Sequence, residues 1–286
     1  MSLQARIAKI FLAVQYRNWN EGSVEQQRRR QKKNSRFMRM PGDVRCTPVN
    51  PMGIPAEWIQ VPGAGPGVIL YLHGGAYALG SLDTHREFVA RLARVTQRRA
   101  LAIAYRLAPE HPFPAALEDA RTAYEWLLQE GYAPADIVMA GDSAGGGLAL
   151  ACMIAQREAG QPLPAGAVLM SPWLDLAHTG ASFNTKAAID PILTREGSKM
   201  YAHWYAGEND LANPLISPLY ADLSGLPPLL IQASADEILL DDSTRLAERA
   251  RQAGVETALE IYEGVFHVFQ IVPFLPESRE AVNNIG

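Results

Sequence analysis

One stretch near the middle of the chain decides the fold: residues 137–147 read Ile-Val-Met-Ala-Gly-Asp-Ser-Ala-Gly-Gly-Gly. A short apolar run, typical of a buried strand, leads into Gly-x-Ser-x-Gly, and a stretch of small residues that favours a helix follows to about Gln156. A strand, a tight turn and a helix in this order form a nucleophile elbow, in which a serine projects from a strained turn. We therefore predict that Ser143 is a nucleophile with an exposed Oγ. Gly141 and Gly145 are expected to be glycines because side chains there would collide.

Two other interpretations of this glycine-rich stretch stay open from these residues alone. A helix start that only packs closely, or a phosphate-binding loop, would also be rich in glycine. The phosphate-binding loop is disfavoured because no lysine follows the glycines.

Working outward, apolar runs alternate with amphipathic segments from about residue 41 onward. This alternation predicts an α/β fold with a mostly parallel central sheet and helices on both of its faces. The segment 44–61, with several prolines and a glycine between short β-prone pieces, predicts an antiparallel hairpin at the sheet edge. The predicted parallel strands are 68–72, 100–105, 137–140, 167–170, 229–231 and 258–262.

The 286 residues are expected to form one core with a helical cap. We divide the chain into an N-terminal helical cap segment (1–40), core (41–175), a cap insertion (176–225) and the rest of the core (226–286). Apolar residues at helical spacing predict a first short helix within 1–40, and a charged stretch predicts a second. The basic run 28–33 is interpreted as a solvated helix face rather than a membrane or nucleic-acid patch, because Glu21 and Glu25 lie close by and no aromatic residue interrupts it.

The amino-acid composition limits the classes of partner that this protein is expected to bind. Lys and Arg total 26 against 30 Asp and Glu, a net charge of −4, so no basic field over the whole protein exists to hold nucleic acid or an anionic membrane. The longest apolar run is too short to cross a bilayer, and we expect no stable membrane anchoring. The two cysteines, Cys46 and Cys152, form no metal-binding or disulfide pattern, and a cytoplasmic location is expected.

A second glycine-rich segment follows the first parallel strand and reads His-Gly-Gly-Ala over 73–76. Glycines allow backbone N–H groups to face a cavity, where they stabilise the charge that develops on a carbonyl oxygen during attack by serine. We predict that Gly74, Gly75 and Ala144 supply these donors as an oxyanion hole. His73 is expected to hold the loop rather than to act as the base.

A serine nucleophile needs a base, and the base needs an acid that orients it. His267 follows the last predicted strand, where a loop at the carboxyl end of the sheet reaches the elbow. Asp236 follows the preceding strand, whereas its rivals Asp241 and Asp242 stand at a helix start, where carboxylates act as caps. We predict a catalytic triad of Ser143, Asp236 and His267, in the chain order of α/β-hydrolases.

These segments together resemble the bacterial hormone-sensitive lipase family of esterases, often called family IV, over residues from about 65 to 270. The resemblance rests on 73–76, 105–110 (Tyr-Arg-Leu-Ala-Pro-Glu), 113–115 (Phe-Pro-Ala), 141–146, Asp236 and His267. It implies an α/β-hydrolase fold, with the family's triad on Ser143, Asp236 and His267 and its oxyanion donors on Gly74, Gly75 and Ala144. Ala76 stands where many members have a third glycine, and Glu237-Ile238 follows Asp236 where Pro-Leu is common.

The expected function is that of a serine carboxylesterase, and the resemblance implies short acyl chains. The partner is a small-molecule ester, and no metal or other cofactor is expected. A peptidase or amidase on the same fold, and a small-molecule receptor without catalysis, remain alternatives; a homodimer through an exposed edge strand near the C-terminus is possible in this scheme. Residues expected to contact the substrate are Tyr77, Asp142, Phe37, Met38, Trp204 and Tyr205.

Overall fold

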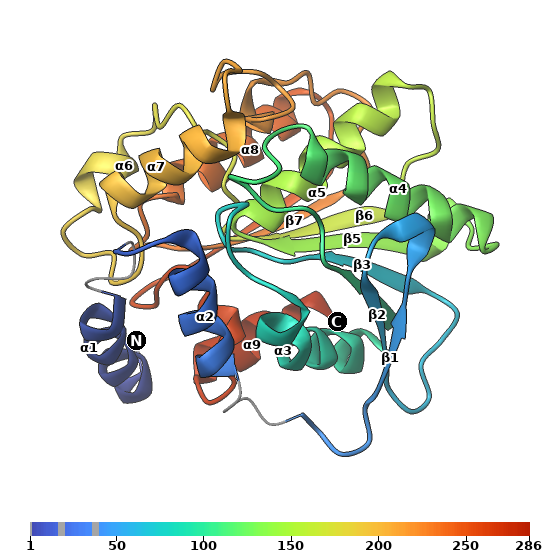
Figure 1. Ribbon diagram of the computed structural model, residues 1–286, viewed down its shortest axis with the longest axis horizontal. Helices are drawn as coiled ribbons and strands as arrows, with labels where there is room; N and C mark the ends of the chain where they lie inside the picture. The colour runs from blue at the N-terminus through green and yellow to red at the C-terminus, as the bar shows by residue number, and fades with distance from the viewer. Residues whose placement is uncertain (1, 17–20, 36–39) are drawn as a thin grey trace.

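The computed structural model describes residues 2–16, 21–35 and 40–286, and it contains one sheet with helices packed around it (Figure 1). The strands of the sheet are β1 (Arg45–Val49), β2 (Ala56–Gln60), β3 (Val68–Leu72), β4 (Arg99–Ile103), β5 (Ile137–Asp142), β6 (Gly166–Met170), β7 (Leu229–Ser234) and β8 (Thr257–Tyr262). The α-helices are α1 (Leu3–Tyr16), α2 (Val24–Ser35), α3 (Leu82–Thr96), α4 (Ala115–Gln129), α5 (Ala144–Glu158), α6 (Ser182–Thr185), α7 (Arg195–Ala206), α8 (Leu240–Gln252) and α9 (Pro276–Ile285). Short 3₁₀ turns lie at Pro51–Gly53, Pro134–Asp136, Pro218–Tyr220 and Phe269–Ile271.

The strand order across the sheet is β1-β2-β4-β3-β5-β6-β7-β8. The hairpin of β1 and β2 is antiparallel, β2 pairs antiparallel with β4, and all other pairs are parallel. The fold class and the predicted strands are therefore confirmed, with boundaries that differ by at most three residues. Because parallel strands end at the same edge, the segments that follow β3, β5, β7 and β8 meet there.

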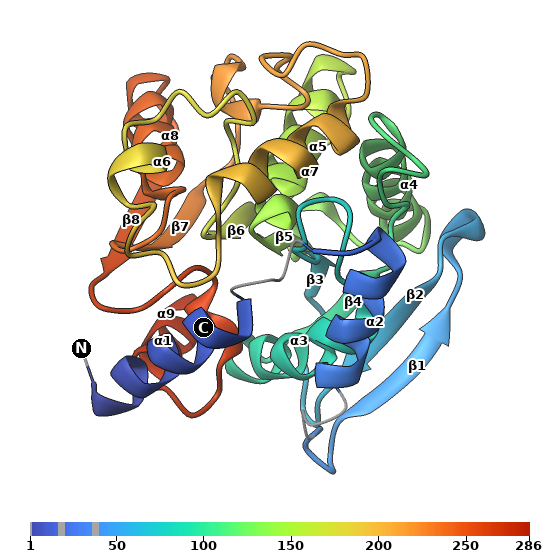
Figure 2. The same ribbon diagram turned by 60° about the vertical axis from the view of Figure 1, so that its left-hand side comes forward.

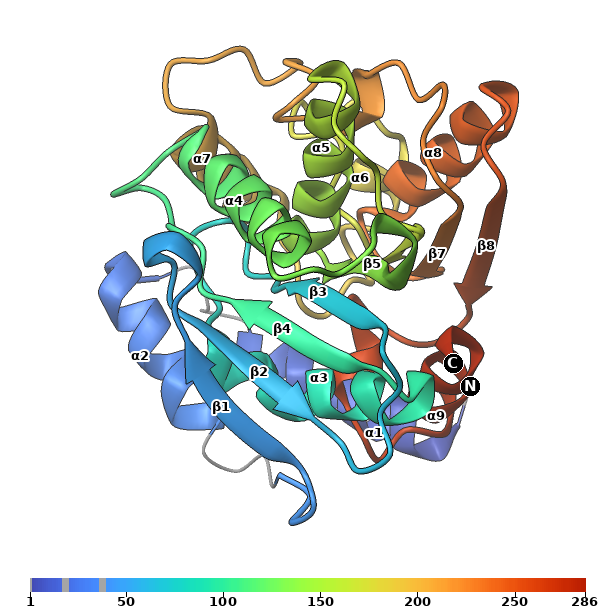
Figure 3. The ribbon, with the colours of Figure 1, turned by 90° about the vertical axis from the view of Figure 1, so that its right-hand side faces the viewer.

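Successive side chains of the central strands point to opposite faces of the sheet, and each face is covered by helices (Figure 3). On β3, Leu70 and Leu72 belong to the core that includes α4, α5 and α8. Ile69 and Tyr71 belong to the opposite core, which includes residues of α3 and α9. Burial on both faces explains why β3 reads as a continuous apolar run rather than an alternating one.

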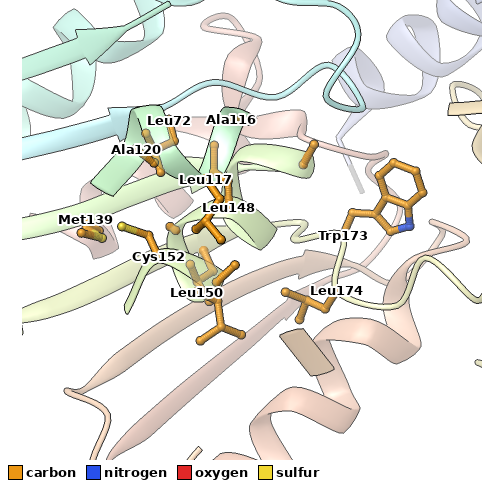
Figure 4. Close-up of a cluster of buried hydrophobic side chains, with 14 of the residues drawn as sticks. Leu72, Ala116, Leu117, Ala120, Met139, Leu148, Leu150, Cys152, Trp173 and Leu174 are labelled. Carbon is orange, nitrogen blue, oxygen red and sulfur yellow. The ribbon is translucent and has the colours of Figure 1, made fainter. Parts of the chain in front are cut away.

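Helix α5 lies at the centre of the larger core, and thirteen of its fifteen residues are buried. Figure 4 shows Leu148 of this helix near Leu72 and Leu117, and Leu150 on another side of the helix, nearer Leu174; all of them belong to the same buried cluster. A helix that is apolar on all sides is stable only when surrounded in this way. The segment that begins directly after Ser143 is thus held on every side.

Helices α1 and α2 appear where the sequence predicts short helices, and α7 lies within the predicted cap insertion. The three helices lie on one side of the molecule (Figure 2). Ala5 and Ala8 of α1 pack against Phe266 and Phe269, which flank His267. Nζ of Lys9 lies 2.6 Å from Oδ2 of Asp236 and ties the same helix to the segment after β7.

Helix α2 is held by polar contacts to the loops beside the site. The Arg28 guanidinium donates to both carboxylate oxygens of Glu110 at 2.7 and 2.8 Å and to the carbonyl of Ala78 at 2.8 Å. The side-chain oxygen of Gln31 accepts the N–H of Gly80 at 2.8 Å. A bilayer-spanning helix is absent from the described part of the chain, since no helix there combines the necessary length with apolar character.

Candidate active site

Ser143 occupies the turn between β5 and α5 with φ of 53°, a left-handed conformation that strains a residue with a side chain. The turn is possible because glycines stand on either side of it. A Cβ atom on Gly141 would collide with the backbone of Gly145, and one on Gly145 would collide with the carbonyl of Leu72. Ser143 is only 8% exposed, in contrast to the prediction of an exposed hydroxyl, and it lines an internal pocket.

The imidazole of His267 lies between the serine and a carboxylate. Its Nε2 atom is 2.9 Å from Oγ of Ser143, and its Nδ1 atom is 2.6 Å from Oε2 of Glu237. All three side chains are at least nine-tenths buried. Because a carboxylate only accepts, Nδ1 carries a proton that it donates to Glu237, which leaves Nε2 free to accept from the serine hydroxyl.

The acid that contacts His267 is Glu237, and the prediction of Asp236 for this contact is wrong. Asp236 points toward α1 and accepts from Lys9, with 23% of its side chain exposed. Glu237 is fully buried and also accepts the N–H of Ser234 at 3.0 Å, which fixes its carboxylate. The only sequence signal for this arrangement is the second carboxylate directly after Asp236, where related sequences often have Pro.

The surroundings of His267 favour its protonated form. Burial by itself lowers the pKa of the imidazole, but the hydrogen bond and negative charge of Glu237, followed by the charges of Asp190 and Asp142, raise it above its ordinary value of 6.5. Asp190 comes from the segment before α7 and accepts the N–H of Ile238 at 2.9 Å. The imidazolium that forms when serine attacks is therefore stabilised from two directions.

Backbone N–H groups near Ser143 come from the loop after β3 and from the first residue of α5. The N–H of Gly74 is occupied, because it donates to Oδ1 of Asp142 at 2.9 Å, so the prediction of Gly74 as an oxyanion donor is wrong. Within the described residues, no acceptor is found for the N–H groups of Gly75, Ala76 and Ala144. Gly75 and Ala76 both have positive φ, 121° and 53°, which turns this loop sharply.

Asp142 is the centre of a buried network that fixes the loop carrying those donors. Besides Gly74, it accepts from the Tyr71 hydroxyl at 2.5 Å, and Nε2 of His85 lies 3.5 Å away. Burial raises the pKa of this carboxyl, but the charge and hydrogen bond of His85 and the other donors lower it below its usual value. Asp142 also borders the pocket, and its contact with substrate stays a prediction.

His73 holds the loop, as predicted. Its Nδ1 atom is 2.8 Å from the carbonyl oxygen of Gly74, and its ring stacks on Tyr105 with centroids 4.3 Å apart. Burial, with a smaller effect of the His85 charge, lowers the pKa of His73 to about 4. An imidazole that stays neutral in this position donates to the backbone and does not approach Ser143.

The pocket beside Ser143 has a volume of about 340 Å³. Among the described residues, its aromatic lining consists of Tyr16, Trp173, Tyr201 and Phe266. The predicted substrate contacts Tyr77, Trp204 and Tyr205 are not part of this lining. Tyr77 and Tyr205 are buried and stack on each other with ring centroids 3.6 Å apart, so they brace the wall from behind.

Phe37 and Met38, also predicted to contact substrate, lie outside the described residues. Within the described part of the chain, no group of three or more His, Cys, Asp or Glu side chains is placed to hold a metal ion.

Comparison with known proteins identifies the family of this chain. Residues 69–271 match the model of a family described as having the alpha/beta hydrolase fold. The chain is 44% identical to an acetyl-hydrolase of Streptomyces hygroscopicus over 251 residues, 86% of this chain and 81% of that protein. It is 38% identical to an esterase of Acinetobacter venetianus over 245 residues, 85% of this chain and 81% of that protein.

Solved structures of esterases also superimpose closely on this chain. An esterase of the bacterial hormone-sensitive lipase family superimposes with a TM-score of 0.96 at 43% identity, covering 100% of this chain and 97% of that one. The esterase EstE5, in a crystal soaked with p-nitrophenyl butyrate, superimposes with a TM-score of 0.94 at 40% identity over the same shares of the two chains.

The fold and the serine–histidine–carboxylate arrangement thus define an α/β-hydrolase, and the chain belongs to the bacterial hormone-sensitive lipase family of esterases. It is a carboxylesterase, an enzyme that hydrolyses carboxylic esters.

Proposed function

We propose that the enzyme hydrolyses short-chain carboxylic esters through an acyl-enzyme intermediate on Ser143. The observation that carries this proposal is the pair of contacts made by His267, 2.9 Å to Ser143 and 2.6 Å to Glu237. A base within hydrogen-bond distance of the nucleophile, itself oriented by an acid, is the arrangement that activates a serine hydroxyl.

In the first half of the reaction, Oγ of Ser143 bonds to the ester carbonyl carbon while its proton moves to Nε2 of His267. The carbonyl oxygen becomes an oxyanion, which the N–H groups of Gly75, Ala76 and Ala144 stabilise; each donor is worth about 3 kcal/mol. The bond to the alcohol oxygen then breaks, and the alcohol leaves with the proton from His267. Glu237 keeps the imidazole in the tautomer that this transfer needs.

In the second half, water attacks the acyl carbon and gives a proton to His267, which returns it to Oγ of Ser143 as the carboxylic acid departs. One ester and one water thus become one alcohol and one acid, with the enzyme restored. In this proposal, segments 1–40 and 176–225 act as the cap, since α1, α2 and α7 all contribute residues to the pocket.

Replacement of Ser143 tests the mechanism. Ser143→Ala removes a single oxygen atom, and we expect kcat for p-nitrophenyl acetate to fall on the order of 10⁶-fold with a nearly unchanged thermal unfolding midpoint. A serine-directed organophosphate should label the wild type and not the variant. Turnover retained by Ser143→Ala would assign the nucleophile to another residue.

The preference for short acyl chains follows from the size of the pocket. A volume of about 340 Å³ is at the small end of the range for ligand pockets, so a growing acyl chain soon has no apolar wall left to contact. We expect kcat/KM for p-nitrophenyl esters to peak between about two and six acyl carbons. A maximum at about ten carbons or more contradicts the proposal, and equal turnover of the matching anilides would favour the peptidase alternative.

A cytoplasmic location and a homodimer remain predictions.

A further inference from the structure

Helix α1 turns five large apolar side chains away from the protein. Those exposed are Leu3, Ile7, Ile10, Phe11 and Val14, with between 61 and 74% of their surface accessible. At 100° per residue they fall within about 100° of one another around the helix axis, which makes one continuous stripe. We call these five residues the outer face of α1. The face that packs on the core carries the small residues Ala5 and Ala8, together with Leu12.

A helix that packs only on the core of its own protein normally buries its large apolar side chains. In α1 most of these side chains are exposed instead. In the described part of the chain, the other large exposed apolar side chains are single residues in separate elements: Met52, Ile189, Ile261 and Phe274. Scattered exposure of that kind is ordinary, whereas a continuous apolar stripe marks an interaction surface.

Charge identifies the kind of partner. Helices α1 and α2 together contain seven basic residues and one acidic residue, a net charge of +6 in a chain whose total is −4. Lys9, Arg28 and Lys32 form ion pairs with Asp236, Glu110 and Asp83. Arg29 and Lys33 of α2 are exposed. The two helices lie on the same side of the molecule (Figure 2).

We propose that the outer face of α1 docks reversibly on an anionic phospholipid surface, with the basic residues of α2 contacting the lipid headgroups. An apolar helix face beside a basic one is the combination that binds at the boundary between headgroups and acyl chains. A second copy of the chain fits less well, because self-association would bring the exposed cations Arg29 and Lys33 of two copies toward each other. In this proposal the basic run 28–33 contacts lipid headgroups and is not only a solvated helix face.

Docking at this face places the pocket next to the lipid. The inner side of α1 contributes Leu12, Gln15 and Tyr16 to the pocket, so the same helix separates the reacting groups from the outer face. The proposal does not depend on the triad mechanism, and Ser143→Ala should bind lipid as the wild type does.

Vesicle sedimentation tests the proposal. The full chain is mixed with vesicles of phosphatidylcholine alone or of equal parts phosphatidylcholine and phosphatidylglycerol, at about 0.05 M and about 0.5 M salt. We expect binding to the anionic vesicles at low salt and at least tenfold weaker binding at high salt, which screens the charges. The triple variant Ile7→Gln/Ile10→Gln/Phe11→Gln should bind at least about tenfold more weakly. Arg29→Gln/Lys33→Gln should lose about 30-fold at low salt.

The matched control is Met52→Gln/Ile189→Gln/Ile261→Gln, which removes three exposed apolar side chains from other elements and should bind like the wild type. Hydrolysis of p-nitrophenyl acetate checks that each variant is folded. The proposal is overturned if the wild type ignores anionic vesicles at low salt, or if the outer-face variant binds them equally well. It is also overturned if the outer face instead mediates self-association, seen as a dimer that only the outer-face variant loses.

Discussion

At the scale of single residues, Asp236 and Glu237 leave the end of β7 in different directions. Asp236 meets the ammonium of Lys9 at 2.6 Å, while Glu237 meets the imidazole of His267 at the same distance. Both side chains are carboxylates, and both follow the strand closely. The difference in their surroundings, partly exposed against fully buried, decides which one orients the base.

Substitution of the two carboxylates separates their roles. We expect Glu237→Gln to lower kcat about 10³- to 10⁴-fold, because an amide does not hold the imidazole in the required tautomer or stabilise its charge. Asp236→Asn, the matched control one residue earlier, should keep kcat within about threefold of the wild type. Steady-state kinetics with p-nitrophenyl acetate measure both; the reverse ranking would return the role to Asp236.

The pH profile of the same variants reports on His267 itself. The base must be neutral to accept a proton, so activity rises with pH through the pKa of the imidazole. Glu237 and its neighbours raise that pKa above 6.5 by more than burial lowers it, and the acidic limb of kcat/KM in the wild type therefore lies above pH 6.5. Glu237→Gln removes the main raising influence and should move the limb to lower pH. A limb in the same place would mean that another group controls it.

At the scale of elements, α1 is attached to the core by few contacts. Small side chains pack against the loop around His267, and the Lys9–Asp236 ion pair adds a polar tie whose side chains are 21% and 23% exposed. Ser2, just before α1, donates its hydroxyl and its backbone N–H to the carboxylate of Glu277 in α9, at 2.9 and 2.6 Å. Because α1 supplies part of the pocket wall, loosening it changes the pocket.

Lys9→Met keeps the length of the side chain and removes its charge. A partly buried ion pair is worth about 1 kcal/mol, so we expect KM to rise about fivefold while kcat changes less than twofold. Arg6→Met removes an exposed charge from the same helix and serves as the control, with KM unchanged. If both variants behave like the wild type, the ion pair does not position α1.

At the scale of the whole molecule, the sheet and α5 form a rigid base beneath the reacting groups. Parallel strands bring the loops after β3, β5, β7 and β8 to one edge, although the residues concerned are spread from Gly74 to His267. The stability of that base comes from the buried apolar core on both faces.

Leu150→Ala tests how much the core around α5 contributes. Leu150 is fully buried, and the cavity left by its truncation should lower the free energy of unfolding by about 3 kcal/mol. Urea denaturation followed by tryptophan fluorescence measures the loss. Leu3→Ala, at a side chain that is 69% exposed, should cost less than about 0.5 kcal/mol. Equal effects at the two positions would mean that α5 is not the packing centre that its burial indicates.

The sequence by itself determined the features that depend on local chemistry. Alternating apolar runs gave the strands, and the glycines around Ser143 and after His73 gave the two sharp turns. The position of His267 in a loop just beyond the last strand was enough to assign it, since no other histidine follows a late strand in this way.

Tertiary structure alone decided which of several neighbouring residues with similar chemistry makes a given contact. Residue type does not distinguish Asp236 from Glu237. The direction of Asp236 is set by Lys9 of α1, and that of Glu237 by the N–H of Ser234 at the end of β7. The N–H of Gly74 is lost to Asp142, 68 residues away, which no glycine pattern reveals. The apolar spacing of α1 predicts a helix, but the packing of Ala5 and Ala8 against Phe266 and Phe269 decides which face meets the core.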